Sequence, residues 1–108
     1  MSEIDITSVA SKIGGMVGPH YAASKAGVEG MMHAYAALLA RDGITANAIS
    51  PALVKTDMIA GVAAASPERL PVGRLGKASE VADLTVAIAS NGFVTGQTVQ
   101  INGGVYMT

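Results

Sequence analysis

The sequence predicts an α/β protein built on a parallel sheet, because a strand, a long helix and a second strand follow one another with only short connections. Residues 4–10 are β-branched and apolar, the helical pattern of residues 20–41 is unbroken, and residues 44–50 form the second strand. A tight turn cannot join parallel strands, so a crossover helix of this kind implies a parallel pair.

Glycine and proline mark where these elements end. Gly43 suits the left-handed cap of the long helix, and Pro51 stops the second strand. Residues 57–78 are rich in proline and glycine around an alanine-rich piece at residues 60–65, which can form one weak helix. A stretch of this length without firm structure is often a lid over a site.

Two further elements close the fold. Ser79 is expected to be the N-cap of a helix over residues 80–90, with Glu80 and Asp83 placed favourably in its first turn. Residues 97–101 are expected to form the last strand.

Composition narrows the class of protein. The 108 residues suit one domain, and with 50% apolar and 14% charged residues the chain can fill a core. A net charge of −1 without a basic cluster disfavours nucleic-acid and membrane partners. The chain has no cysteine, no signal-peptide pattern and no apolar run near the ~20 residues that cross a bilayer. These features predict a cytoplasmic protein.

The long helix is apolar on most sides and rich in small residues, which predicts burial on more than one face. One face is expected to meet the sheet and the other a second helix or a second subunit. The alternative is an unusually alanine-rich surface helix. His33, four residues after Glu29, predicts a solvated or interface pair, and the two histidines without a carboxylate cluster predict no metal site.

Three residues suggest catalysis. Tyr21 and Lys25 lie four residues apart, so a helix places them on one face. A free phenol has a pKa near ~10, and a neighbouring ammonium favours the phenolate, which makes tyrosine a usable general acid or base. Ser8 ends a strand at the edge where parallel sheets bind ligands, so its hydroxyl can hold a substrate oxygen. The Tyr–Lys spacing alone also arises by chance in many helices.

The set Ser8-x12-Tyr21-x3-Lys25, followed by 50-SPALVKTD-57, resembles the short-chain dehydrogenase/reductase family. Residues 71-PVGRLGKASEVA-82 are similar to the family's P-x-G-R-x-G-x-P-E-E-V-A, and 95-TGQTVQINGG-104 to its T-G-Q-x-x-x-V-D-G-G ending. The resemblance runs from about residue 4 to residue 104. It implies the carboxyl-terminal half of a Rossmann-type, doubly wound parallel sheet.

The resemblance also implies a role for each of the three residues. Tyr21 would exchange a proton with the carbonyl or alcohol oxygen, and Ser8 would orient and polarise that oxygen. Lys25 would hold the nicotinamide ribose hydroxyls and favour the ionised tyrosine. By the same resemblance, Tyr21 and Lys25 both contact the cofactor.

The segment after the second strand would border the nicotinamide. Backbone groups of Val54 would meet its carboxamide, and Thr56 would lie near the carboxamide or the pyrophosphate. The family usually has P-G where this sequence has Pro51-Ala52, and alanine fits if its backbone stays at negative φ. Residues 57–78 would be the substrate lid.

Within the family, 91-NGFVTGQTVQINGGVYM-107 and 20-HYAASKAG-27 are most similar to 3-oxoacyl-acyl-carrier-protein reductases. This implies an NAD(P)(H)-dependent enzyme, with NADPH favoured, that reduces a 3-oxoacyl thioester carried on acyl carrier protein. A homodimer or homotetramer is implied as well. The alternative substrate classes are a sugar, a steroid or a polyol.

Other motifs of the family do not occur in this sequence: the T-G-x-x-x-G-x-G loop, the N-N-A-G motif and the catalytic asparagine. Met1 falls just before the strand with Ser8, which predicts the carboxyl-terminal part of a longer reductase. Without that loop, the main anchor of a pyrophosphate, the chain is expected to bind cofactor poorly. The edge of the first strand is expected to invite another chain. The alternative function is an inactive fragment that retains only self-association.

Overall fold

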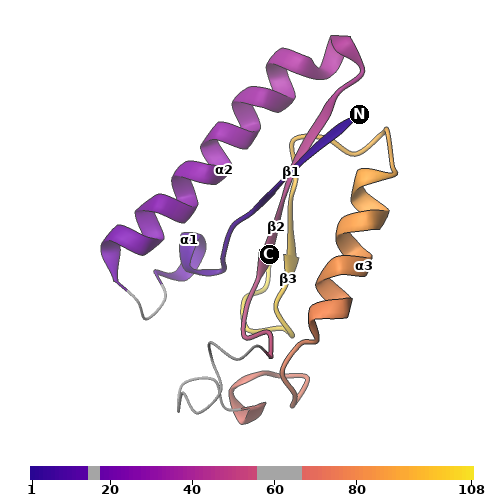
Figure 1. The fold of residues 1–108 in the computed structure, drawn as a ribbon. Coiled ribbons are helices and arrows are strands. Elements are labelled where there is room, and N and C mark those ends of the chain that lie inside the picture. Colours follow the sequence, from indigo (N-terminus) through magenta and orange to yellow (C-terminus); the bar gives the residue numbers. More distant parts are fainter. Residues whose placement is uncertain (15–17, 56–66) are drawn as a thin grey trace.

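The computed structural model describes residues 1–14, 18–55 and 67–108 (Figure 1). Its helices and strands are, in chain order, β1 (Ser2–Ile6), α1 (Ala10–Ile13), α2 (Pro19–Leu39), β2 (Thr45–Pro51), α3 (Ala78–Ala89) and β3 (Thr98–Ile101). Single turns of 3-10 helix occur at Ala40–Asp42 and Pro67–Arg69. The strand–helix–strand unit expected at the start of the chain is present.

The three strands form a parallel sheet in the order β1-β2-β3. The register aligns Ser2 with Thr45 and Ala48 with Thr98. Residues 45–50 of the central strand are all buried, as a parallel strand covered on both faces requires. The predicted α/β class with a parallel sheet is therefore confirmed.

The two long helices lie on opposite sides of this sheet (Figure 1). Met32 and Ala36 of α2 pack against Ala46 and Ala48 of β2, and these four buried residues form the core cluster. α3 contacts β1 and β2. The three strands run towards the end of the molecule where α2 and α3 begin (Figure 1). The carboxyl ends of the strands and the first turns of both helices therefore lie at the same end of the molecule.

The first strand is shorter and earlier than the predicted 4–10, because it spans Ser2–Ile6. The chain turns at Ser8, whose side chain accepts a hydrogen bond from the N–H of Ala10 at 3.2 Å. Its carbonyl accepts a second bond, from the N–H of Ser11 at 3.0 Å. These two bonds start α1, a helix that the sequence pattern did not predict.

The long helix begins at Pro19 and ends at Leu39, where residues 20–41 were predicted. Proline is favourable in the first turn because it has no N–H to satisfy there. Gly43 follows the turn of 3-10 helix with φ 75° and ψ 18°, and its N–H donates to a carbonyl three residues earlier at 3.1 Å. The predicted left-handed cap is confirmed.

The helix predicted over residues 80–90 spans Ala78–Ala89, and its N-cap is Lys77 rather than Ser79. The carboxylate of Glu80 reaches back and accepts the N–H of Lys77 at 2.9 Å. Glu80 is the third residue after Lys77, the position from which a glutamate can bond back to the N–H of the cap residue. This bond satisfies a backbone N–H that has no partner within the helix, so the helix begins earlier than predicted.

The strands predicted over residues 44–50 and 97–101 are confirmed to within one residue at either end. Of the predicted lid at residues 57–78, residues 57–66, with the expected weak helix at residues 60–65, lie outside the described part of the chain. The remainder holds the turn of 3-10 helix at Pro67–Arg69 and leads into α3.

One face of α2 is exposed in the part of the chain that the structure describes. The buried residues of the helix are Glu29, Met32 and Ala36, whereas Met31, Tyr35 and Leu38 are exposed large apolar side chains. The expected second contact of this helix therefore stays a prediction. None of the described helices is long and apolar enough to cross a membrane.

β1 lies at one edge of the described sheet and carries two carboxylates on one face. Burial, and then the neighbouring Asp5, raises the pKa of Glu3. Among the described residues, each of the two side chains has a buried oxygen without a hydrogen-bond partner. Charges on an edge strand discourage pairing with another strand, so they weigh against the expectation that this edge invites a second chain.

Asn47 is fully buried on β2 and holds the loop before β3. Its amide donates to the carbonyl of Val94 at 2.9 Å and accepts the N–H of Gln97 at 3.1 Å. We predict that Asn47→Ala lowers the free energy of unfolding by about 2–4 kcal/mol, because two backbone groups lose buried partners. Urea denaturation measures the change.

The exposed Asn91 is the matched control, since its side chain accepts a single N–H, that of Phe93, at 3.0 Å. Asn91→Ala is expected to cost at most about 1 kcal/mol. Equal losses for the two variants would contradict the special role of Asn47.

Candidate active site

Ser8 lies in the turn at the carboxyl end of β1, held against the end of β2. The N–H groups on either side of it donate to the carbonyls of Ile49 and Pro51, at 2.9 and 3.4 Å. The Ser8 oxygen accepts the N–H of Ala10, and no acceptor for its own hydrogen is recorded among the described residues. The hydroxyl can therefore donate to a molecule bound beside the end of β2.

Tyr21 and Lys25 lie in the first turns of α2, and both are half-buried. The Lys25 Nζ lies 5.5 Å from the centre of the Tyr21 ring, where the negative face of the ring attracts a cation. Within the described part of the chain, this ammonium has no carboxylate partner. The helix thus places a phenol beside an ammonium that is free to bind another group.

Thr7 joins the Ser8 turn to the same part of α2. It is buried, and its Oγ1 lies 2.9 Å from the carbonyl oxygen of Lys25 and 3.1 Å from a carboxylate oxygen of Glu29. The single hydroxyl hydrogen is shared between these two acceptors. Because Thr7 precedes Ser8 directly, the structure brings the serine turn and the Tyr21–Lys25 segment to one edge of the sheet.

The chain after β2 bends sharply. Leu53 has φ 50°, a conformation that leucine rarely adopts, while Ala52 is not among the residues with positive φ. Ala52, which stands where the family usually has glycine, therefore keeps the negative φ that an alanine needs at this position. Val54 then forms a bridge with Gly76, made by the N–H of Lys55 and the carbonyl of Leu53.

This bridge leaves the N–H and C=O of Val54 itself without a partner among the described residues. Adjacent free donor and acceptor groups suit a primary amide, which also has one of each. Ser50, fully buried on the face of β2 that α2 covers, likewise has a hydroxyl without a described partner. Thr56 lies outside the described residues, so its predicted role has no structural account.

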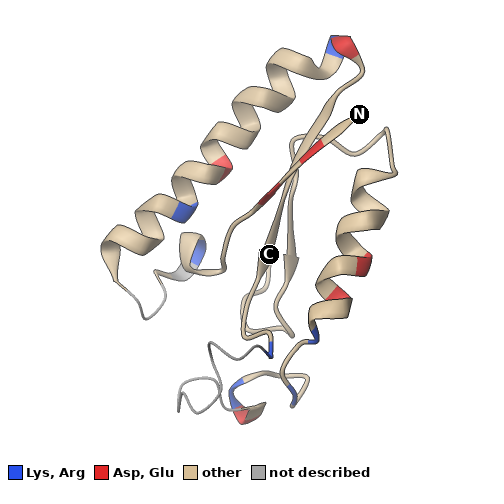
Figure 2. Cartoon of the chain, viewed as in Figure 1, with Lys and Arg blue, Asp and Glu red and all other residues tan. Residues whose placement is uncertain are grey.

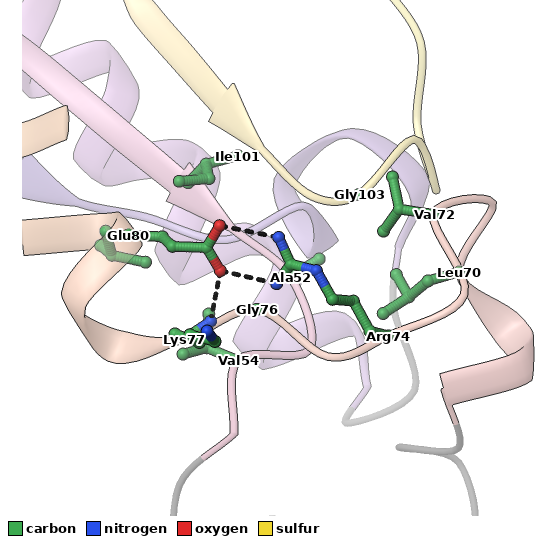
Figure 3. Close-up of a pocket in the computed structure, with 11 residues that line it drawn as sticks. Ala52, Val54, Leu70, Val72, Arg74, Gly76, Lys77, Glu80, Ile101 and Gly103 are labelled. Atoms are coloured by element: carbon green, nitrogen blue, oxygen red, sulfur yellow. Dashed lines mark hydrogen bonds and ion pairs between the residues drawn. The ribbon is translucent and has the colours of Figure 1, made fainter. Parts of the chain in front are cut away.

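A cavity of about 130 Å³ opens beside this segment, between the start of α3 and the end of β3 (Figure 3). Its apolar lining includes Ala52, Val54, Leu70, Val72, Val81 and Ile101. Arg74 and Glu80 face each other across it through two bonds, at 2.7 and 2.8 Å (Figure 3). A Cβ on Gly103, whose φ is 60°, would come within 2.9 Å of a Val72 methyl, so glycine permits this close packing.

Hydrogen bonds from the Arg74 guanidinium, followed by the N–H of Lys77, lower the pKa of Glu80 to about 2. The same pair raises the pKa of Arg74. Because the folded pKa of the carboxyl is lowered, the pair stabilises the fold above the ordinary carboxyl range. That contribution is lost as the pH falls from the ordinary value of 4.5 towards 2.

Glu29 is a residue of this region that the sequence pattern misassigned. Lys25 and Glu29 are the two charged residues between the ends of α2, which is otherwise tan in Figure 2. Glu29 is buried while His33 is exposed, and the carboxylate instead contacts groups from α1 and β3, so the expected pair is wrong. The sequence signal that could have identified Glu29 as a buried residue is a single carboxylate in an otherwise apolar helix.

The charge of Glu29 is maintained by its neighbours. Burial raises the pKa of Glu29, but hydrogen bonds from Ser11 and Thr7 and the nearby Lys12 ammonium lower it by more. The pKa therefore lies below its ordinary value, and Glu29 is an ionised residue inside the protein at neutral pH.

The sequence model of the enoyl-(acyl carrier protein) reductase family matches residues 2–106. The chain is 42% identical to the 3-oxoacyl-[acyl-carrier-protein] reductase FabG of Pseudomonas aeruginosa, over 97% of this chain and 45% of that protein. It is 38% identical to human (3R)-3-hydroxyacyl-CoA dehydrogenase, over 98% of this chain and 43% of that protein. The chain thus spans a little under half the length of these curated relatives.

A solved structure shows the same likeness. It is a short-chain dehydrogenase/reductase of Brucella melitensis, titled glucose/ribitol dehydrogenase, and it matches with a TM-score of 0.90 at 34% identity. The match covers 99% of this chain and 46% of that one. The predicted partial Rossmann-type fold is confirmed by this likeness.

We predict that Arg74→Gln raises the pKa of Glu80 from about 2 towards the ordinary carboxyl value, because the main stabilising partner of the carboxylate is removed. Carbon-13 NMR titration of the labelled carboxyl measures the change. Lys77→Gln is the control and should shift the titration less, since the Lys77 charge contributes least. An unchanged Glu80 titration in Arg74→Gln would refute the pairing.

Proposed function

We propose that this chain, which belongs to the short-chain dehydrogenase/reductase family, carries the proton-transfer part of an NAD(P)(H)-dependent oxidoreductase that interconverts a carbonyl and an alcohol. The observation that carries the proposal is the meeting of two segments at the carboxyl edge of the sheet. The Ser8 turn and the Tyr21–Lys25 segment of α2 are joined there through Thr7.

Each of the three residues has a role in reduction. The Tyr21 hydroxyl donates its proton to the carbonyl oxygen, and the Ser8 hydroxyl donates a hydrogen bond to the same oxygen. The Lys25 ammonium, 5.5 Å from the tyrosine ring, stabilises the negative charge left on Tyr21. In the direction of oxidation the ionised Tyr21 receives the proton from the alcohol, while Ser8 and Lys25 keep the same roles.

The residues of the chain fit the nicotinamide end of the cofactor. Lys25 would hold the ribose hydroxyls, the free backbone groups of Val54 would bind the carboxamide, and Pro51 and Ala52 would border the ring. A nicotinamide held there supplies or takes up the hydride at the substrate carbon. The family's phosphate-binding loop does not occur in this sequence, so these residues would bind the phosphates weakly.

The proposed substrate is a 3-oxoacyl thioester, with NADPH as the favoured reductant. By their names, one relative reduces a 3-oxoacyl group and another oxidises a 3-hydroxyacyl group, so both act at carbon 3 of an acyl chain. The Brucella relative is named for a sugar and a polyol, glucose and ribitol, so that substrate class is the alternative.

The exposed face of α2, with Met31, Tyr35 and Leu38, supports a homodimer or homotetramer. We propose the cytoplasm as the place of action, in keeping with the bacterial 3-oxoacyl reductases among the relatives.

Tyr21→Phe is expected to lower NADPH-dependent reduction of acetoacetyl coenzyme A by about 10²–10⁴-fold, because the proton donor is removed. The loss of NADPH absorbance measures the rate. Tyr35→Phe changes an exposed tyrosine of the same helix and should leave the rate unaltered. A Tyr21→Phe variant as fast as Tyr35→Phe would overturn the proposed role.

If the unaltered chain shows neither turnover nor binding of NADPH, the alternative of an inactive, self-associating fragment gains support. Sedimentation velocity then tests that alternative, which predicts a stable oligomer in the absence of cofactor. A monomer would contradict it.

A further inference from the structure

The carboxylate of Glu29 joins four segments of the chain. The side chain is 6% exposed, and one of its oxygens accepts hydrogen bonds from Thr7 and Ser11. The other oxygen accepts a bond from Thr98 at 3.2 Å and lies 3.3 Å from the Lys12 ammonium. Four donors, from the end of β1, from α1 and from β3, thus converge on one group of α2.

Such a carboxylate is a costly way to fill this space. Removing a charged group from water is energetically unfavourable, and apolar residues of similar volume often stabilise a protein as well or better. The neighbours of Glu29 along the same face, Met32 and Ala36, are apolar and buried. The need to fill space in the core therefore does not explain why a charged glutamate occupies this position.

The partners of Glu29 lie on both sides of Ser8. Thr7 precedes Ser8 directly, while Ser11 and Lys12 belong to α1, which follows it. Thr7 also bonds the carbonyl of Lys25, one helical turn before Glu29. The carboxylate therefore holds the segments before and after Ser8 against the helix that presents Tyr21 and Lys25.

We propose that Glu29 is a positioning residue, which fixes the Ser8 hydroxyl relative to Tyr21 and Lys25 by holding the residues on both sides of Ser8. The proposal rests on the proposed function, because it concerns the same site. Glu29 does not touch the substrate. It acts through the turn that Ser8 occupies.

The amide of Ala10 reports this geometry directly, since its N–H donates to Ser8 Oγ. We predict that Glu29→Leu increases hydrogen exchange at Ala10 and Ser11 at least about tenfold, because the turn loses its anchor. The amide of Ala48, bonded to the carbonyl of Gln97 in the core, serves as the reference and should change much less. NMR-detected exchange measures all three amides in one sample.

Glu29→Gln is the conservative variant, and it should open the turn less, because one oxygen and the shape of the side chain remain. Glu68→Gln alters an exposed glutamate and is the matched control, with no change at any of the three amides. If Glu29→Leu does not fold, Glu29→Gln carries the test. Equal changes at Ala10 and Ala48 would show a merely structural role and overturn the proposal, as would no change at Ala10.

Turnover provides a second measurement. Glu29→Gln should lower kcat several-fold with little change in the KM for NADPH, because the residue orients Ser8 and does not bind the cofactor. A rise in KM alone would overturn the proposal. The exchange measurement needs neither cofactor nor turnover. If Tyr21→Phe does not slow the reaction, the proposed function fails, but the exchange result still decides whether Glu29 holds the Ser8 turn.

Discussion

The buried central strand β2 determines where the other elements of the structure lie. β1 and β3 both pair with it, and α2 and α3 cover its two faces. Parallel pairing directs all three strands the same way, so their carboxyl ends share one edge. The turn of Ser8, the chain after Pro51 and the start of α2 with Tyr21 therefore lie together. The candidate active site follows from this topology before any single side chain is considered.

Much of this could be predicted because the patterns are local. The strand–helix–strand order and the cap at Gly43 depend on residues close in the sequence, and the structure has both. The spacing of Tyr21 and Lys25 likewise needs only the geometry of one helix. The three motifs that resemble the family predicted the partial Rossmann-type fold, and the likeness to a solved relative confirms it.

The role of Glu29 escaped prediction because it depends on contacts between distant segments. Glu29 lies one helical turn from His33, so local spacing pairs them, but the fold brings Thr98 and α1 to the carboxylate instead. Ser79 is a different case, because the bond that displaces it is local. Ser79 is a good cap by residue type, but Glu80 accepts the N–H of Lys77, three residues earlier, and the helix begins there.

The proposed function requires that this chain hold the nicotinamide end of the cofactor beside Tyr21 and Lys25. Saturation-transfer NMR of NADPH with the purified chain tests it most directly, because it shows which part of a weakly bound ligand touches the protein. We expect magnetisation to reach the nicotinamide and its ribose, and Lys25→Met to abolish the transfer. Transfer confined to the adenine, or unaltered by Lys25→Met, would contradict it.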